Sequence, residues 1–172
     1  MNPEVVDAGA AGDASRHINV DIVAATIEDK SIVRHLVELY VYDFSEYMEW
    51  DVDEHGLFGY QYLDNYWTEP DRHPFLIRVD GKLAGFAFVR ANEPVPGTCD
   101  MAEFFVLRKY RRRGIGIVAA LALFARFPGA WQVRQMELNK SATEFWHRAI
   151  PVAFTETIDD NRPVQHFTVG ID

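Results

Sequence analysis

The sequence predicts an α/β (α+β) domain in which a mixed, mainly antiparallel central sheet carries helices on both faces. Hydrophobic residues make up 48 % of the 172 residues, which suits one packed domain. Segments with strand-like alternation and segments with helix-like periodicity follow one another along the chain, as they do in mixed folds. Asp80-Gly81 lies between two apolar runs and is a strong signal for an antiparallel hairpin.

The first elements are defined by alternation and by a capping pattern. Residues 18–24 alternate between apolar and polar side chains, which predicts a strand. Thr26 and Asp29 have the spacing of a capping box, so we expect a helix that runs to about Met48. The apolar side chains of this segment repeat with helical spacing and should face the sheet.

The segment 51–71 should be irregular or hold a short helix, with Pro70 and Pro74 at its exit. The later strands are expected at 75–79, 82–90, 99–107, 131–136, 152–157 and 164–169, the last two joined by a loop at 158–163. The later helices are expected at 117–127 and 141–150.

Composition limits the class of protein. Residues 1–16 are small and polar, so we expect a flexible tail rather than a signal peptide, ahead of a single domain at 17–172. The longest apolar run, 115–125, is too short to cross a bilayer. Cys99 is the only cysteine, and no bound metal is expected. A net charge of −9 argues against a nucleic-acid partner. We therefore expect a cytoplasmic protein with no membrane or nucleic-acid partner.

The most informative stretch is 106–116. It reads as the end of a strand, a basic loop and two glycines that open an apolar helix, and five of the six residues at 108–113 are basic. The N-terminus of a helix attracts anions through its free N–H groups and its dipole. A glycine there lets a phosphate approach the backbone without a Cβ in the way. The stretch therefore predicts a pyrophosphate site.

Three kinds of phosphate site can be compared with this stretch. A dinucleotide fingerprint matches Gly114, Gly116 and Ala119, with Glu137 downstream, but its glycines should directly follow a strand and a second mononucleotide-binding half is missing. A P-loop is excluded because no Gly-Lys-Ser/Thr occurs. The pyrophosphate loop of an acyl-CoA binder has Arg-x-x-Gly-x-Gly after a strand, which is the spacing that begins at Arg111.

Two motifs resemble one known family. The run Arg-Arg-Arg-Gly-Ile-Gly at 111–116 resembles the acetyl-CoA signature of the GCN5-related N-acetyltransferase (GNAT) superfamily. The run Asn-Lys-Ser-Ala at 139–142 is similar to the Asn-x-x-Ala opening of that family's next helix. The order of the expected elements also agrees, so the resemblance covers residues 18–169. It implies a GNAT fold and acetyl-CoA as a cosubstrate.

The resemblance also implies roles for individual residues. Val106 and Leu107 would offer backbone groups to the pantetheine arm, and Asn139 would hydrogen-bond the same arm. The pyrophosphate would be wrapped by the backbone N–H groups of Arg111, Arg112, Arg113, Gly114, Ile115 and Gly116.

Glu103 is the candidate general base. It lies three residues before Val106 on the same strand, in a region where some GNAT members place a base glutamate. Shielded by Phe104 and Phe105, its carboxylate could have a raised pKa and take a proton from the amine, directly or through a water. Alternatively, Glu103 pairs with a basic residue or orients the amine without taking a proton.

The sequence departs from the family at the general acid. Many members carry a tyrosine seven residues after the motif asparagine, whereas this chain has Trp146, whose indole N–H is not a useful acid. His147 should face elsewhere, because a helix turns by roughly 100° per residue. The acid is left open, since a coenzyme A thiolate can leave unaided. Trp146 is expected to form a wall of the pantetheine tunnel or part of the core.

The acceptor side is suggested by residues 38–71, which contain ten acidic and ten aromatic side chains and no lysine or arginine. In the GNAT arrangement this segment covers the acceptor end of the cleft, where it would attract a cationic amine. Asp43 and Glu46, on the last turns of the first helix, are the predicted acceptor residues. Alternatively, the segment is a solvated acidic face over an aromatic core.

The leading interpretation is an N-acetyltransferase that moves an acetyl group from acetyl-CoA to a primary amine of a cationic small molecule or peptide. A non-catalytic acyl-CoA-binding domain is the main alternative, because the usual tyrosine is missing. A dinucleotide-binding oxidoreductase is a third interpretation. The exposed aromatic side chains would allow a homodimer.

Overall fold

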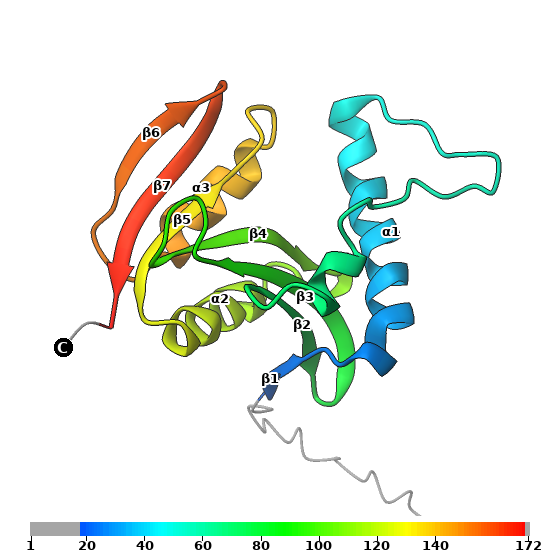
Figure 1. Cartoon of the computed structure of the whole chain (residues 1–172), viewed down its shortest axis with the longest axis horizontal. Coiled ribbons are helices and arrows are strands. Elements are labelled where there is room, and N and C mark those ends of the chain that lie inside the picture. Colours follow the sequence, from blue (N-terminus) through cyan, green and yellow to red (C-terminus); the bar gives the residue numbers. More distant parts are fainter. Residues whose placement is uncertain (1–17, 171–172) are drawn as a thin grey trace, which may run out of the picture.

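A seven-stranded sheet forms the centre of the protein, in the order β1-β2-β3-β4-β5-β7-β6 (Figure 1). The computed structural model describes residues 18–170, so the expected tail at 1–16 lies outside the described residues. Neighbouring strands are antiparallel except for β4 and β5, which pair in parallel. The predicted fold class, a mixed and mainly antiparallel sheet with helices on both faces, is confirmed.

The bounds of the elements agree with the sequence-based ones to within a few residues. The strands are β1 (Val20–Ala24), β2 (Arg72–Val79), β3 (Lys82–Ala91), β4 (Thr98–Val106), β5 (Gly129–Arg134), β6 (Thr155–Asp159) and β7 (Arg162–Val169). The helices are α1 (Lys30–Met48), α2 (Ile115–Arg126) and α3 (Lys140–Ala149), with 3₁₀ turns η1 (Ile27–Asp29), η2 (Asp64–Trp67) and η3 (Arg108–Tyr110).

Two local signals in the sequence act as expected. The backbone N–H of Thr26 donates to the Asp29 carboxylate at 3.0 Å, which forms the capping box before α1. Asp80 and Gly81 join β2 to β3 with φ values of 50° and 75°, which are the left-handed angles of a type I′ turn.

Two predicted boundaries are wrong. Strand β2 begins at Arg72, so Pro74 lies inside the strand instead of before it. Its register with β1 extends only from Phe75 to Val79, and a proline is tolerated where a neighbouring strand has ended. The connection from β6 to β7 is a tight turn at Asp160 and Asn161, whose φ values are 50° and 60°, because short polar side chains tolerate the left-handed region.

Helix α1 covers one face of the sheet, and α2 and α3 cover the other (Figure 1). Each face has its own apolar core. The α1 side is rich in aromatic rings, including Phe86, Phe88 and Phe105. On the other side, Phe124 of α2 packs against Trp131 of β5, and Trp146 of α3 belongs to the same core.

Strand β4 is shaped to open the sheet. Phe88 pairs with Glu103 and Val89 pairs with Met101, so Ala102 is the extra residue of a β-bulge. Strand β4 pairs with β5 only over residues 98–100. Beyond that point the two strands separate, and the edge of β4 that faces β5 is left without a strand partner.

Candidate functional site

A cleft of about 1350 Å³ lies where β4 and β5 separate. One wall comes from α1 and the loop after it, and the other comes from the end of β5, the segment that follows it and the β6–β7 turn. The first wall carries the aromatic side chains Tyr40, Phe44, Trp50, Phe58, Tyr60 and Tyr62.

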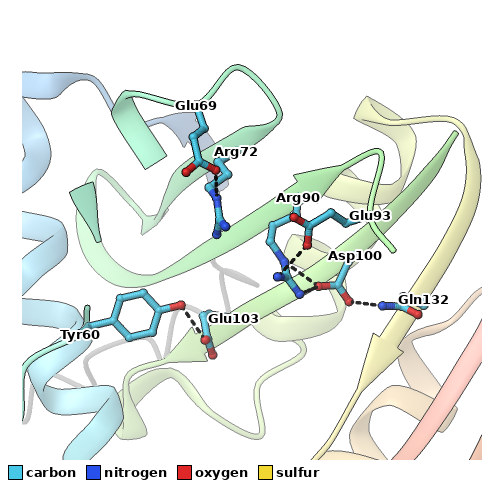
Figure 2. Close-up of polar contacts among 8 residues, drawn as sticks. All are labelled: Tyr60, Glu69, Arg72, Arg90, Glu93, Asp100, Glu103 and Gln132. Atoms are coloured by element: carbon cyan, nitrogen blue, oxygen red, sulfur yellow. Dashed lines mark hydrogen bonds and ion pairs between the residues drawn. The ribbon is translucent and has the colours of Figure 1, made fainter. Parts of the chain in front are cut away.

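Glu103 lies on the wall of this cleft and is held by two phenols. The hydroxyl of Tyr40, on α1, donates to its Oε2. The hydroxyl of Tyr60, on the loop after α1, donates to its Oε1 at 2.9 Å (Figure 2). The sequence placed Glu103 correctly on the strand, but nothing in the local sequence indicated which side chains meet it.

Burial raises the pKa of Glu103, although the hydrogen bonds from Tyr40 and Tyr60 and the charge of Arg90 act in the opposite direction. Burial and the charge of Glu103 raise the pKa of both phenols as well, so both phenols stay protonated at neutral pH. The carboxylate is therefore the group of the three that can accept a proton without a tyrosinate being formed.

A second carboxylate in the cleft is already neutralised. Arg90 of β3 donates to Oδ2 of Asp100 at 3.0 Å from Nε and at 2.5 Å from Nη2. Gln132 of β5 donates to the other oxygen of Asp100 at 3.0 Å, and Glu93 pairs with Arg90 at 2.7 Å (Figure 2). Because Asp100 is committed to this network, Glu103 is the better candidate for a base.

The basic loop before α2 is tied to α1. Asp43 pairs with Arg108 at 2.8 Å through one oxygen and with Arg111 through the other. The Nε of Arg111 also donates to the carbonyl of Val106 at 2.6 Å. These contacts hold the loop in one shape, so Arg111 acts on the backbone of its own loop and not only towards a ligand.

Asp43 and Glu46, the predicted acceptor residues, lie outside the lining of the cleft. The hydrogen bond to Asp43, together with the charges of Asp43 and Glu46, raises the pKa of Arg108. Both acids thus act on the basic loop, because they lie on a side of α1 that is turned away from the cleft, whereas Phe44 and Met48 of the same turns line it.

The two glycines of the motif serve different purposes. Gly114 caps α2 with a φ of 78°, and a Cβ added there would meet no atom of the described residues within 4 Å. The space above Gly114 is therefore open to a phosphate. A Cβ on Gly116 would lie 3.0 Å from the ring of Phe145, so this glycine allows α2 and α3 to pack closely.

The other residues that are predicted to bind the pyrophosphate lie next to Gly114 in the chain. Arg112 and Arg113 are exposed, and Arg112 has a φ of 59°, which turns the chain into α2. Ile115 is buried in the apolar core under the loop. Because the helix begins here, its first N–H groups have no helical partner and can bind an anion.

Val106 and Leu107 have fewer free backbone groups than predicted. The carbonyl of Val106 accepts from Arg111, and the N–H of Leu107 donates to the carbonyl of Ala84 at 2.8 Å. The open edge of β4 before these residues is the better place for an extended ligand to form backbone hydrogen bonds.

Asn139 caps its own helix. Its Oδ1 accepts from the N–H of Ala142 at 3.1 Å and from the hydroxyl of Ser141 at 2.9 Å. Nothing in the structure tests its predicted contact with pantetheine. The oxygen already serves the helix, and the side-chain NH₂ is the group that could serve a ligand.

Trp146 is a core residue. It is 5 % exposed and packs against Phe104 and Phe145, with ring centroids 5.1 and 4.9 Å away. His147 faces away from the cleft and pairs with Glu156 at 2.6 Å. The structure thus confirms that Trp146 is part of the core and that His147 points elsewhere.

Most of the acidic side chains at 38–71 have partners within the chain. Glu38 accepts from the N–H groups of Phe58 and Gly59 at 2.8 and 3.1 Å, which anchors the loop on α1. Similar internal contacts engage Asp43, Asp53, Asp64, Glu69 and Asp71. Asp51 alone among the ten predicted acids lines the cleft. A solvated acidic face is therefore the better description of most of this segment.

Among residues 18–170, no group of three or more His, Cys, Asp and Glu side chains is placed to hold a metal ion. Within the same residues, no helix has the length and apolar character needed to span a membrane.

Known structures share this fold at low sequence identity. An acetyltransferase from Thermus thermophilus is 14 % identical, with a TM-score of 0.69, and the match covers 87 % of this chain and 97 % of that one. The ribosomal-protein-S18-alanine N-acetyltransferase of Escherichia coli is 12 % identical, with a TM-score of 0.63 and coverage of 90 % and 96 %.

A third structure is the PaiA N-acetyltransferase of Thermoplasma acidophilum in complex with coenzyme A, which is 13 % identical with a TM-score of 0.59 and coverage of 87 % and 99 %. No curated protein matches the sequence. The model of the acetyltransferase (GNAT) family matches residues 30–150, which is well over half of the chain. The chain belongs to the GNAT family of acetyltransferases.

Proposed function

We propose that the protein transfers an acetyl group from acetyl-CoA to a primary amine of a cationic acceptor. The observation that carries this proposal is Glu103, a carboxylate with a raised pKa on the wall of the cleft. It lies three residues before the end of β4, and the basic loop and the glycine-capped helix α2 follow that strand directly. A base and an anion site are thus joined by one short segment.

Acetyl-CoA fits the residues that are present. Its pyrophosphate would be held by the first N–H groups of α2 above Gly114, where residues 18–170 place no atom within 4 Å of an added Cβ. Its pantetheine arm would lie along the open edge of β4. The cosubstrate supplies an activated acetyl group. The thiolate of coenzyme A is a good leaving group, so a protein acid is not needed.

The protein contributes position and a base. The amine is held in the cleft beside the thioester, and proximity of this kind supplies much of the rate. Glu103 takes the proton that the ammonium must lose before it can attack. Trp146 donates no proton, because its indole is packed in the core.

The charge of the cleft supports a cationic acceptor. Its lining carries the carboxylates of Asp51, Glu93, Asp100, Glu103, Glu137 and Asp160, and three arginines. Each of these arginines is paired with an acid, namely Arg90 with Asp100, Arg134 with Asp159 and Arg162 with Asp160. The surplus of carboxylates and the aromatic wall both favour an ammonium group.

The proposal is tested by incubating the protein with acetyl-CoA and a panel of amines, and by following the release of free thiol. We suggest spermidine, phenethylamine, an aminoglycoside and a short peptide with a free N-terminal amine. Thiol release that depends on one of these amines is the expected result. Binding of acetyl-CoA without turnover of any amine would favour a non-catalytic binding domain. Thermal stabilisation by NAD or NADP instead of coenzyme A would favour an oxidoreductase.

A further inference from the structure

The two phenols on Glu103 come from different elements, and the ring of Tyr60 lies 5.9 Å from that of Phe88. Tyr40 lies within α1, and its ring packs edge-on against Phe44, Phe86 and Phe105, with centroids 4.6, 5.6 and 5.7 Å away. Tyr60 lies on the loop between α1 and η2, outside any helix or strand. Glu38 anchors that loop two residues earlier along the chain, through the N–H of Phe58.

Each oxygen of Glu103 accepts a hydrogen bond from one phenol, so an ammonium in the cleft can reach the carboxylate through a phenol as well as at a remaining lone pair. Tyr60 donates its O–H to Glu103, and a phenol oxygen in that state keeps lone pairs that can accept a further hydrogen. Tyr60 also lines the cleft. Its oxygen is therefore suited to contact a donor in the cleft and Glu103 at the same time.

We propose that Tyr60 carries the proton from the acceptor ammonium to Glu103, an inference that rests on the proposed N-acetyltransferase function. In this step an N–H bond of the ammonium breaks and an O–H bond forms on the oxygen of Tyr60. The original O–H bond of Tyr60 breaks, and an O–H bond forms on Oε1 of Glu103. The products are a neutral amine, an unchanged phenol and a protonated carboxyl group, so atoms and charge balance.

The surroundings favour transfer onward to Glu103 over storage on Tyr60. Burial and the charge of Glu103 raise the pKa of Tyr60, so a tyrosinate is disfavoured and the phenol must gain one proton as it loses the other. Tyr66, which is 3 % exposed, acts on the pKa of Tyr60 in the same direction. The hydroxyl of Tyr66 makes no hydrogen bond within residues 18–170.

The charged groups around Glu103 leave it able to accept a proton. Tyr40 approaches from α1, Tyr60 from the loop, Arg90 from β3 and Asp100 from β4 itself. Arg90 forms ion pairs with Asp100 and Glu93, whereas within the described part of the chain Glu103 forms none. The carboxylate of Glu103 is thus held by neutral donors, which it can exchange for a proton of its own.

The test compares Tyr60→Phe with Tyr40→Phe, using acetyl-CoA and the panel amine that the wild-type protein acetylates fastest. Tyr42→Phe is the matched control, because Tyr42 is 63 % exposed on α1 and does not line the cleft. For each variant we would measure kcat across pH, the Kd of acetyl-CoA by calorimetry, and the melting temperature.

We expect Tyr60→Phe to lower kcat at the pH plateau by about 10²-fold with the Kd of acetyl-CoA unchanged. Like Tyr40→Phe, it also removes a hydrogen bond from Glu103, so its low-pH limb should move to higher pH as well, and its melting temperature should fall no further than that of Tyr40→Phe. Tyr40→Phe should lower the plateau by less than about tenfold and move the low-pH limb to higher pH, because it removes a hydrogen bond that stabilises the ionised carboxylate. Tyr42→Phe should behave as the wild type. In mixtures of H₂O and D₂O, the wild-type kcat should decrease non-linearly with the fraction of D₂O, because two protons move together.

Several results would overturn the relay. One is a plateau kcat for Tyr60→Phe within a few-fold of the wild type, which would mean that Glu103 takes the proton directly. Others are equal losses in Tyr60→Phe and Tyr40→Phe, a loss of acetyl-CoA affinity in Tyr60→Phe, or a linear dependence on the D₂O fraction. If the wild type acetylates no amine, the proposed function itself fails, and the relay fails with it.

Discussion

Asp43 on α1 forms an ion pair with Arg111 in the loop before α2, and the two residues are 68 positions apart in the chain. Arg111 also holds the carbonyl of Val106, so the pair links α1, the end of β4 and the basic loop. The sequence predicted that Asp43 binds the acceptor amine. In the structure its carboxylate instead holds the loop that forms the proposed pyrophosphate site.

Replacing Asp43 by asparagine should weaken the binding of acetyl-CoA. The pair is partly exposed and orders the loop by at most about 1 kcal/mol, so the rise in Kd should be no more than roughly fivefold. The KM of the amine should stay within about twofold of the wild type. Calorimetry with coenzyme A and steady-state kinetics measure the two quantities. Glu46→Gln is the control, because Glu46 acts on Arg108 only through its charge. A raised amine KM with an unchanged Kd would restore Asp43 to the acceptor site.

Glu103→Gln should separate chemistry from stability. Removal of the base should lower kcat by about 10²-fold and abolish the low-pH limb, with the Kd of acetyl-CoA unchanged. Burial raises the folded-state pKa of Glu103 above its unfolded value. The folded state therefore binds the proton more tightly, and this group contributes stability below its unfolded pKa that is lost as pH rises through its folded pKa.

It follows that Glu103→Gln should not lower the melting temperature at neutral pH, because it removes a carboxylate that is costly to bury once ionised. At neutral pH the variant should be at least as stable as the wild type. At pH 4, where Glu103 is protonated, it should have no advantage in stability. Melting curves at pH 4 and pH 7.5 check this. A lower melting temperature at both pH values would assign Glu103 a structural role. If kcat fell little but the amine KM rose, Glu103 would only position the amine.

Gly114→Ala should weaken the binding of coenzyme A by at least about tenfold, because the new Cβ enters the space open to the pyrophosphate. The left-handed φ of 78° adds a strain of roughly 1 kcal/mol to the folded state. Gly97→Ala provides the matched control, since Gly97 has a φ of 82° and equally open surroundings, at the other end of β4. Calorimetry and melting curves on both variants should show equal losses of stability but a loss of affinity only in Gly114→Ala. Equal affinities of the two variants for coenzyme A would show that the pyrophosphate does not bind at Gly114.

Trp146→Phe should reduce stability but spare the chemistry. The smaller ring leaves a gap beside Phe104, Phe124 and Phe145, which should cost about 1–3 kcal/mol in the free energy of unfolding. The kcat of the folded protein should stay within about threefold of the wild type, because an indole donates no proton. Denaturant unfolding and kinetics at 20 °C provide the two measurements. A collapse of kcat at normal stability would show that Trp146 takes part in the reaction.

The sequence by itself determined the features that depend on near neighbours. The Asp80-Gly81 turn, the capping box at Thr26 and the glycine at the start of α2 are set by backbone preferences within a few residues. The two motifs predicted the family, and the position of Glu103 on β4 followed from its spacing to Val106. For Trp146 the sequence left a wall of the pantetheine tunnel and the core as alternatives, and its burial in the structure decided for the core.

Only the tertiary structure decided which charges are free and which groups meet. Tyr60 reaches Glu103 across 43 positions and Arg111 reaches Asp43 across 68, and no periodic pattern encodes such pairs. The acids at 38–71 appeared available because local sequence shows charge but not partners. The energy of a charge depends on its burial and on the groups within a few ångströms, and these are fixed only when α1, the loop and β4 pack together.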